Sequence, residues 1–115
     1  MTKIKASSKN IDNINNNIIP KKNVIIYYYS DTCPFCIMMK GLWKEICNKY
    51  KNEKNITIIS VDRKLMSKLN KNLHIEMVPT IIFYKKGVKK FEFLKERNLE
   101  NLSNFFDKCI KNINI

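Results

Sequence analysis

Apolar residues occur along the chain in short runs that predict strands. Two runs, Val24–Ser30 and Ile56–Val61, are almost continuously apolar and rich in β-branched and aromatic residues. Such runs are typical of strands that are buried on both faces. Two further runs, Thr80–Tyr84 and Val88–Leu94, flank a short polar turn with one glycine, which indicates a hairpin. A fifth candidate, Lys3–Ser7, would be a short edge strand.

Between and after these strands, apolar residues at intervals of three and four predict four amphipathic helices. Pro34 suits the first position of the second helix, and Ser8 and Asn98 are candidate caps of the first and last helices. The expected buried stripes are Ile11, Ile14 and Ile18; Met39, Trp43, Ile46 and Tyr50; Leu65, Leu69 and Leu73; and Leu99, Leu102, Phe106, Cys109 and Ile113.

The predicted element order is β-α-β-α-β-α-β-β-α. Strands that alternate with helices favour an α/β fold with a mainly parallel sheet and helices on both faces. The last two strands would add an antiparallel edge. The chain has 115 residues and shows neither an internal repeat nor a linker. We therefore expect a single domain over residues 1–115.

The composition is strongly basic, with 22 Lys and Arg against 10 Asp and Glu and a formal net charge of +12. The lysines are scattered, which favours a solvated basic surface, and attraction to nucleic acid, acidic proteins or an anionic membrane is the alternative. Arg63 and Arg97 are the only arginines, so reading of nucleic-acid bases is disfavoured. The longest apolar run, Val24–Tyr29, is too short to span a membrane. The polar segment Thr2–Asn17 lacks the apolar core of a secretory signal, so we expect a cytosolic protein.

Four cysteines are too few for a disulfide scaffold, but two of them form the motif Cys33-Pro34-Phe35-Cys36 between a strand and a helix. At the start of a helix, free amides and the helix dipole favour a thiolate on Cys33. Cys36 would lie one turn further along, on the same face and deeper. We therefore expect Cys33 to be the nucleophile and Cys36 to resolve the mixed disulfide.

Two other interpretations of this pair remain open. It could be an inert structural pair, or it could supply two of the four ligands of a zinc site. Cys47, Cys109 and His74 would have to complete that zinc site, but none of them is paired at ligand spacing. We expect Cys47 and Cys109 to pack in the core and His74 to lie in a loop.

The chain resembles the thioredoxin superfamily in three segments. These are the strand, CPFC motif and helix of Val24–Tyr50; Met77-Val78-Pro79-Thr80, which looks like the family's cis-proline loop; and the hairpin Thr80–Phe93. The resemblance implies a thioredoxin fold with a mixed sheet, and a cis Val78–Pro79 bond that faces Cys33. It also implies that Val78, Pro79, Pro34 and Phe35 contact the substrate, and that the Cys33–Cys36 disulfide serves in place of a cofactor. A plain turn before a strand is the alternative interpretation of Pro79.

Some residues depart from the family pattern. Thr32 stands where thioredoxins have tryptophan, and the dipeptide Pro34-Phe35 is closer to the CPYC motif of glutaredoxins, although their Gly-Gly turn is missing. Tyr27 takes the place of a buried acid, and a phenol with a pKa near 10 is a poor base at neutral pH. The proton acceptor for Cys36 is therefore left open, with water as one candidate. We expect the pair to be more oxidising than that of thioredoxin.

The favoured function is thiol–disulfide exchange with protein substrates, with electrons supplied by an upstream reductase or by glutathione. A glutathione-coupled, glutaredoxin-like reductase is one alternative. A non-enzymatic thioredoxin-like adaptor, whose basic surface recruits an acidic partner, is another.

Overall fold

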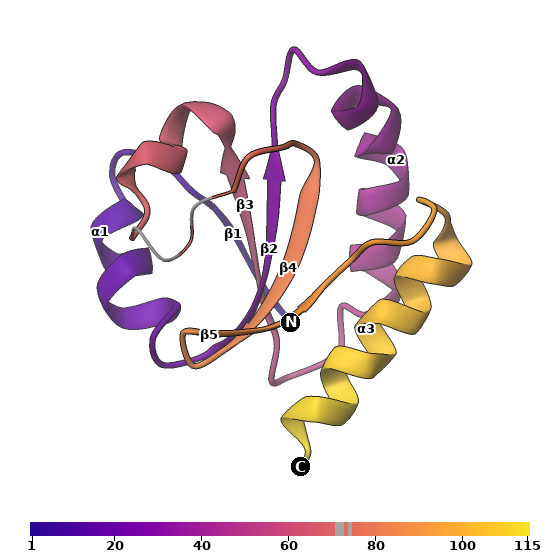
Figure 1. The fold of residues 1–115 in the computed structure, drawn as a ribbon. Coiled ribbons are helices and arrows are strands. Elements are labelled where there is room, and N and C mark those ends of the chain that lie inside the picture. Colours follow the sequence, from indigo (N-terminus) through magenta and orange to yellow (C-terminus); the bar gives the residue numbers. More distant parts are fainter. Residues whose placement is uncertain (71–72, 74) are drawn as a thin grey trace.

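Five strands form one central sheet with the order β1-β3-β2-β4-β5. The computed structural model describes residues 1–70, 73 and 75–115. The strand bounds are Thr2–Lys5 (β1), Asn23–Tyr29 (β2), Thr57–Asp62 (β3), Thr80–Lys85 (β4) and Val88–Glu92 (β5). All five predicted strands are therefore confirmed, with ends that differ by at most two residues (Figure 1).

The strand directions correct one expectation. Strand β3 pairs in parallel with both β1 and β2, but β2 pairs antiparallel with β4, and β4 pairs antiparallel with β5. The sheet is therefore evenly mixed rather than mainly parallel. The chain enters β4 at the end of the sheet where β2 and β3 finish, so β4 has to run back along β2.

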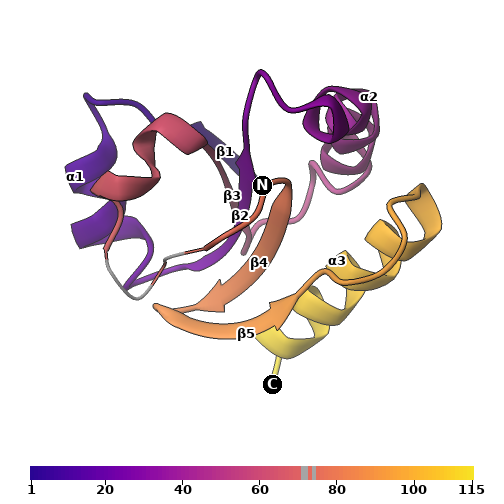
Figure 2. The same ribbon diagram turned by 45° about the horizontal axis from the view of Figure 1, so that its top comes forward.

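Helices cover both faces of the sheet (Figures 1 and 2). Helices α2 (Pro34–Lys49) and α3 (Leu99–Ile113) lie on one face. The other face carries α1 (Ile11–Asn13), the π-helix η1 (Ile14–Ile18) and the 3₁₀-helix η2 (Arg63–Lys68). The result is a three-layer α/β arrangement, as the sequence predicts.

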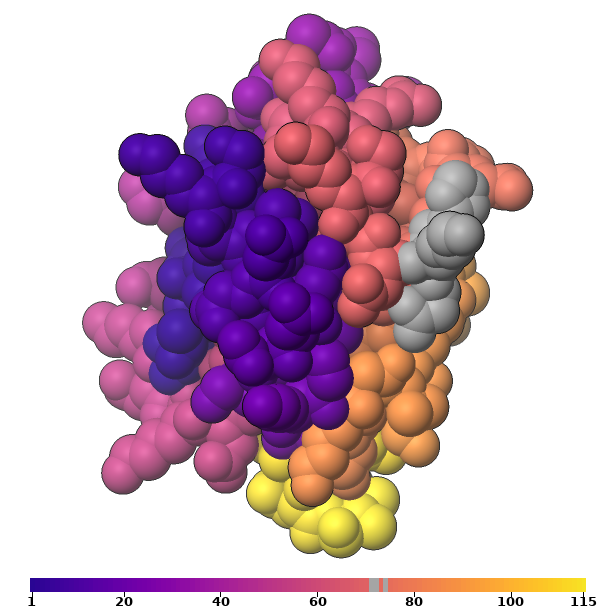
Figure 3. All heavy atoms as spheres, turned by 90° about the vertical axis from the view of Figure 1, so that its left-hand side faces the viewer, coloured from indigo at the N-terminus to yellow at the C-terminus, as the bar shows by residue number. Residues whose placement is uncertain are grey.

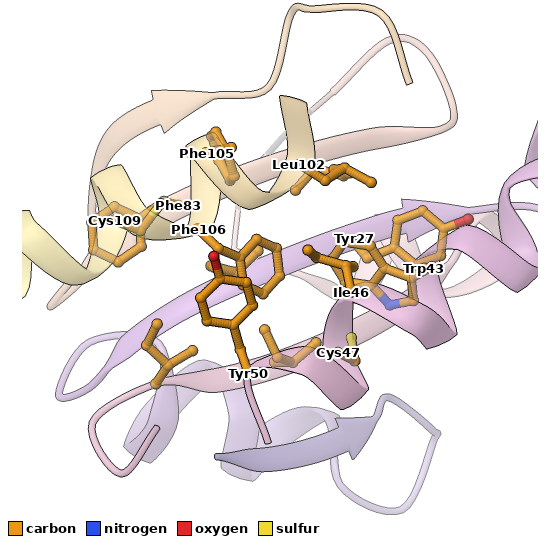
Figure 4. Packing of buried hydrophobic residues seen from close by; sticks show 14 of the residues in the cluster. Tyr27, Trp43, Ile46, Cys47, Tyr50, Phe83, Leu102, Phe105, Phe106 and Cys109 are labelled. Carbon is orange, nitrogen blue, oxygen red and sulfur yellow. The ribbon is translucent and has the colours of Figure 1, made fainter. Parts of the chain in front are cut away.

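Aromatic rings fill the core under α2 and α3. Trp43 from α2 stacks on Tyr27 from β2 at 4.5 Å between ring centroids, and it meets Phe106 from α3 edge-on at 5.9 Å (Figure 4). The opposite face of β2 contributes Val24, Ile26 and Tyr28 to a second buried cluster. Strand β2 is thus buried on both faces, as its continuous apolar run predicts.

The first predicted helix differs in geometry. It begins at Ile11 after Asn10, so the expected cap at Ser8 is wrong. Its second half is a π-helix, in which Ile19 N donates to Ile14 O at 3.0 Å. The wider turn brings Ile19, rather than Ile18, under Ile14 in the core.

The third predicted helix is a short 3₁₀-helix instead of an α-helix. Element η2 ends at Lys68, and Leu69 is already extended. The chain leaves the helix because Asn70 binds Asn15 of η1 through its backbone and its side chain, at 3.2 and 3.4 Å. Figure 3 shows these two helical segments packed side by side over this face of the molecule.

The hairpin of β4 and β5 turns at Lys86 and Gly87. Both have positive φ, +50° and +85°, as a two-residue turn of the hairpin type requires. Strand β5 closes one edge of the sheet with the exposed residues Lys89 and Lys90, and β1 closes the other with Lys3 and Lys5. Within the described ranges, no helix is both long and apolar enough to cross a membrane.

Candidate active site

The CPFC motif lies where β2 passes into α2. Cys33 is the N-cap of α2, with extended backbone (φ −84°, ψ 122°), and Pro34 follows at the start of the helix. A tight turn precedes it, in which Cys33 N donates to Ser30 O at 3.2 Å. The structure therefore confirms the local geometry that the sequence predicts for this motif.

The Cys33 sulfur lies among donors that favour its ionised form. The backbone amide of Cys36 is the largest of these influences and lowers the pKa of the Cys33 thiol. The Cys36 side chain, the Phe35 amide and the charge of Arg97 act in the same direction, and only desolvation opposes them. The helix N-terminus thus stabilises a thiolate at Cys33.

The Cys36 sulfur has the opposite preference. Cys36 is only 4% exposed, and burial raises the pKa of its thiol. The Ser30 amide donates to Cys36 Sγ at 3.4 Å and offsets part of this rise. The side-chain hydrogen bond between Cys36 and Cys33 raises the Cys36 pKa while it lowers that of Cys33. The two thiols therefore interact, and their pKa values shift in opposite directions.

The proline loop lies against the first cysteine. The Val78–Pro79 peptide bond is cis. Cys33 Sγ lies 3.8 Å from the carbonyl oxygen of Val78. Cys33 and Val78 are 45 positions apart in the sequence but lie next to each other in the structure, as the resemblance implies.

A groove of about 540 Å³ continues from this loop and is lined by Pro79, Met77, Leu94 and Arg97, among others. Met77 and Leu94 are 75% and 81% exposed, so the groove offers apolar surface to a partner. The guanidinium of Arg97 lies 5.8 Å from the ring centroid of Phe35, itself well exposed. We call this the front groove.

Two residues of the front groove, Leu94 and Arg97, are absent from the site that the sequence predicts. They belong to the connection between β5 and α3. The only sequence signal is that Arg97 is one of two arginines in a chain rich in lysine.

A second cavity lies on the other side of Cys36. It has a volume of about 480 Å³, and its lining includes Cys36, Tyr27, Tyr29, Trp43 and Lys40. Burial raises the pKa of Tyr27 above the ordinary value for a phenol, so this side chain stays protonated at neutral pH. We call this space the rear cavity.

The other two cysteines are core residues, as predicted. Cys47 and Cys109 are fully buried, and burial raises the pKa of Cys47 to about 11. Burial raises the pKa of Cys109 as well. His74, the remaining candidate ligand of a zinc site, lies outside the described residues. In the part of the chain that the structure describes, no three His, Cys, Asp or Glu side chains are grouped to hold a metal.

Comparison with known proteins agrees with this architecture. The sequence matches the thioredoxin family over residues 4–108. It is 34% identical over 91 residues to protein disulfide-isomerase A4 of Mus musculus, covering 76% of this chain and 14% of that protein. It is 33% identical over 101 residues to protein disulfide-isomerase of Saccharomyces cerevisiae, covering 86% of this chain and 18% of the relative. The chain thus spans less than a fifth of the length of either relative.

A solved structure supports the fold independently. The crystal structure of human ERp44 superimposes with a TM-score of 0.72, at 23% identity, over 90% of this chain and 31% of that one. At this identity the likeness concerns the fold alone. The family match over residues 4–108 covers most of the chain and leads to one conclusion: the chain belongs to the thioredoxin family.

Proposed function

We propose that the chain is a dithiol–disulfide oxidoreductase that acts on protein disulfides through Cys33 and Cys36. The observation that supports this most directly is geometric: Cys33 caps the N-terminus of α2, Cys36 follows within the first turn, and the Val78 carbonyl beside the cis Val78–Pro79 bond lies 3.8 Å from Cys33 Sγ. The lowered pKa of Cys33 and the raised pKa of Cys36 agree with this arrangement. These opposite directions favour Cys33 as the attacking thiolate and Cys36 as the thiol that resolves the mixed disulfide.

In the first step, the Cys33 thiolate attacks one sulfur of a substrate disulfide. A bond forms between Cys33 Sγ and that sulfur, the substrate S–S bond breaks, and the second substrate sulfur leaves as a thiolate that takes a proton from water. The Val78 backbone would pair with the substrate chain in extended form, and Pro34, Phe35 and Pro79 would contact its side chains.

In the second step, Cys36 gives its proton to water and its sulfur attacks Cys33 Sγ. The mixed disulfide breaks, the substrate leaves as a thiolate that is then protonated, and the Cys33–Cys36 disulfide forms. Two electrons have passed to the substrate. The rear cavity, which Cys36 lines, offers the route for water, since the buried phenol of Tyr27 is a poor acceptor.

The direction of electron flow follows the relative stability of the two redox states. Donors that stabilise the Cys33 thiolate stabilise the reduced pair and therefore make the disulfide a stronger oxidant. The lowered pKa of Cys33 agrees with an oxidising pair, and a potential above that of thioredoxin stays a prediction from the Pro34-Phe35 dipeptide. Equilibration in glutathione buffers would measure it, and a potential at or below that of thioredoxin would contradict it.

The activity itself is tested by reduction of insulin in the presence of dithiothreitol. Wild type should accelerate the reaction and Cys33→Ser should not. Cys36→Ser should accumulate a mixed disulfide at Cys33, which mass spectrometry would detect as added substrate mass. Equal turnover by wild type and Cys33→Ser would exclude Cys33 as the nucleophile.

The physiological electron donor, the location and the partners stay predictions. Recycling by glutathione with glutathione reductase, compared with recycling by thioredoxin reductase, would separate the two classes of donor. The formal charge of +12 favours substrates or partners with acidic surfaces. Fractionation of cells that express the protein would test the cytosolic location.

A further inference from the structure

The floor of the rear cavity is a row of residues on three neighbouring strands. Lys5 of β1 pairs with Ser60 of β3, which pairs with Tyr27 of β2, so the three side chains lie in line on one face of the sheet. Lys3 lies two residues before Lys5 and shares its face, and Tyr29 stacks on Tyr27 at 5.5 Å. All five line the cavity.

The wall of the cavity is one face of α2. Cys36, Lys40 and Trp43 are spaced by four and three residues, so they point the same way from the helix, and all three line the cavity. Trp43 is 6% exposed, and its indole Nε1 has no hydrogen-bond partner among the described residues. Helix α2 covers the middle of the sheet, and the cavity is the space left between it and the edge strand β1.

The lining of the cavity has a definite chemical character. Three lysines, Lys3, Lys5 and Lys40, meet one acid, Asp31, which leaves a net positive charge. Tyr27 stacks between Tyr29 and Trp43, and Tyr27 and Trp43 are each only 6% exposed, so the half-buried Tyr29 and the edges of the other two rings supply the apolar surface between the lysines. A ligand that fits both features has a planar apolar body and a negative group.

We propose that the rear cavity binds a small aromatic anion, a carboxylate or sulfonate on one or two fused rings. The rings of the ligand lie against Tyr29 and the exposed edges of Tyr27 and Trp43, and the anionic group lies toward Lys5 and Lys40. A volume of about 480 Å³ is in the range of small-molecule pockets. The site is separate from the front groove, and its binding does not require that Cys33 or Cys36 be redox-active.

The chain offers a local probe, because Trp43 is its only tryptophan. In ¹⁵N-labelled protein, the single indole N–H signal should move saturably as naphthalene-2-sulfonate is added. The neutral isostere naphthalene-2-sulfonamide should bind about tenfold more weakly, because each exposed lysine is worth up to about fivefold in affinity. Equal affinity for the two compounds would overturn the preference for an anion.

Matched variants test the position of the site. Lys5→Gln/Lys40→Gln should weaken sulfonate binding about tenfold. Lys54→Gln/Lys111→Gln removes the same charge from exposed residues outside the cavity and should change affinity less than twofold. An equal effect of both pairs, or no saturable shift of the indole signal at millimolar sulfonate, would overturn the proposal. Insulin reduction by the same samples shows separately whether the proposed redox function holds.

Discussion

The N-cap of α3 depends on one side chain, and its removal has a calculable effect. Asn98 Oδ1 accepts a hydrogen bond from the amide of Asn101 at 2.8 Å. Asn98→Ala leaves that amide without its partner and should lower the free energy of unfolding by about 1 kcal/mol, within a range of about 0.5–2. Helix α3 buries Leu102 and Phe106 against the sheet, so the loss should register in global unfolding.

The shift in melting temperature follows from chain length. An unfolding entropy of about 2.1 cal/mol/K per residue gives about 0.24 kcal/mol/K for 115 residues. A loss of about 1 kcal/mol should therefore lower Tm by about 4 °C. Urea unfolding followed by tryptophan fluorescence is the matching assay, because Trp43 contacts Phe106 of α3 at 5.9 Å.

Two control variants isolate the cap. Asn98→Asp keeps an acceptor at the same position and should stay within about 0.5 kcal/mol of wild type. Asn104→Ala changes an exposed asparagine in the body of α3 and should not destabilise the protein, since alanine has the higher helix propensity. If Asn98→Ala unfolds at the same urea concentration as wild type, the capping argument is refuted.

Three further outcomes are expected. Tyr27→Phe should change the rate of insulin reduction less than twofold relative to wild type at any pH from 6 to 8, because the raised pKa of Tyr27 keeps its phenol protonated in that range. A large loss of rate confined to neutral pH would instead show that Tyr27 transfers a proton. Arg97→Gln should raise the pH midpoint of Cys33 alkylation by iodoacetamide, because it removes a charge that lowers the Cys33 pKa; an unchanged midpoint would contradict this. Tyr50→Phe should cost about 1 kcal/mol by urea unfolding, since Tyr50 donates to Asp107 at 2.5 Å. Burial is the main reason that the pKa of Tyr50 is raised to about 12. The protonated phenol therefore contributes its full stabilisation below pH 10 and loses it as the pH approaches 12. If Tyr50→Phe is still less stable than wild type at pH 12, this expected pH dependence is wrong.

The sequence predicts strands and the redox motif well because their signals are local. Strand β2 is an unbroken apolar run, and the Cys33–Cys36 spacing itself places two sulfurs on one helical turn. The loop at Pro79 was found through the resemblance, since nothing local places it beside Cys33. Arg97 lies beside Phe35 because the hairpin directs the chain after β5 back toward the start of α2. No residue spacing in the sequence predicts this contact.

The two helices whose geometry differs from the prediction have a similar cause. Ile11, Ile14 and Ile18 fit an α-helix, but the core selects Ile19, and a π-turn supplies the one extra residue that this choice needs. The leucine pattern after β3 likewise suits an α-helix. Hydrogen bonds from Asn70 to a residue 55 positions earlier end it after a short 3₁₀ segment. Tertiary contacts override local pattern in both places.

The two borders of the sheet have a consequence for how copies of the protein behave together. Lys3 and Lys5 lie on β1, and Lys89 and Lys90 lie on β5, the two edge strands of the sheet. A second copy of the protein could add a strand to this sheet only if its edge strand came within about 4.8 Å of β1 or β5. The lysine ammonium groups of the two copies would then lie close together and repel each other. Charge repulsion between lysines therefore disfavours fibril-like association at both sheet edges, and high salt should weaken this repulsion.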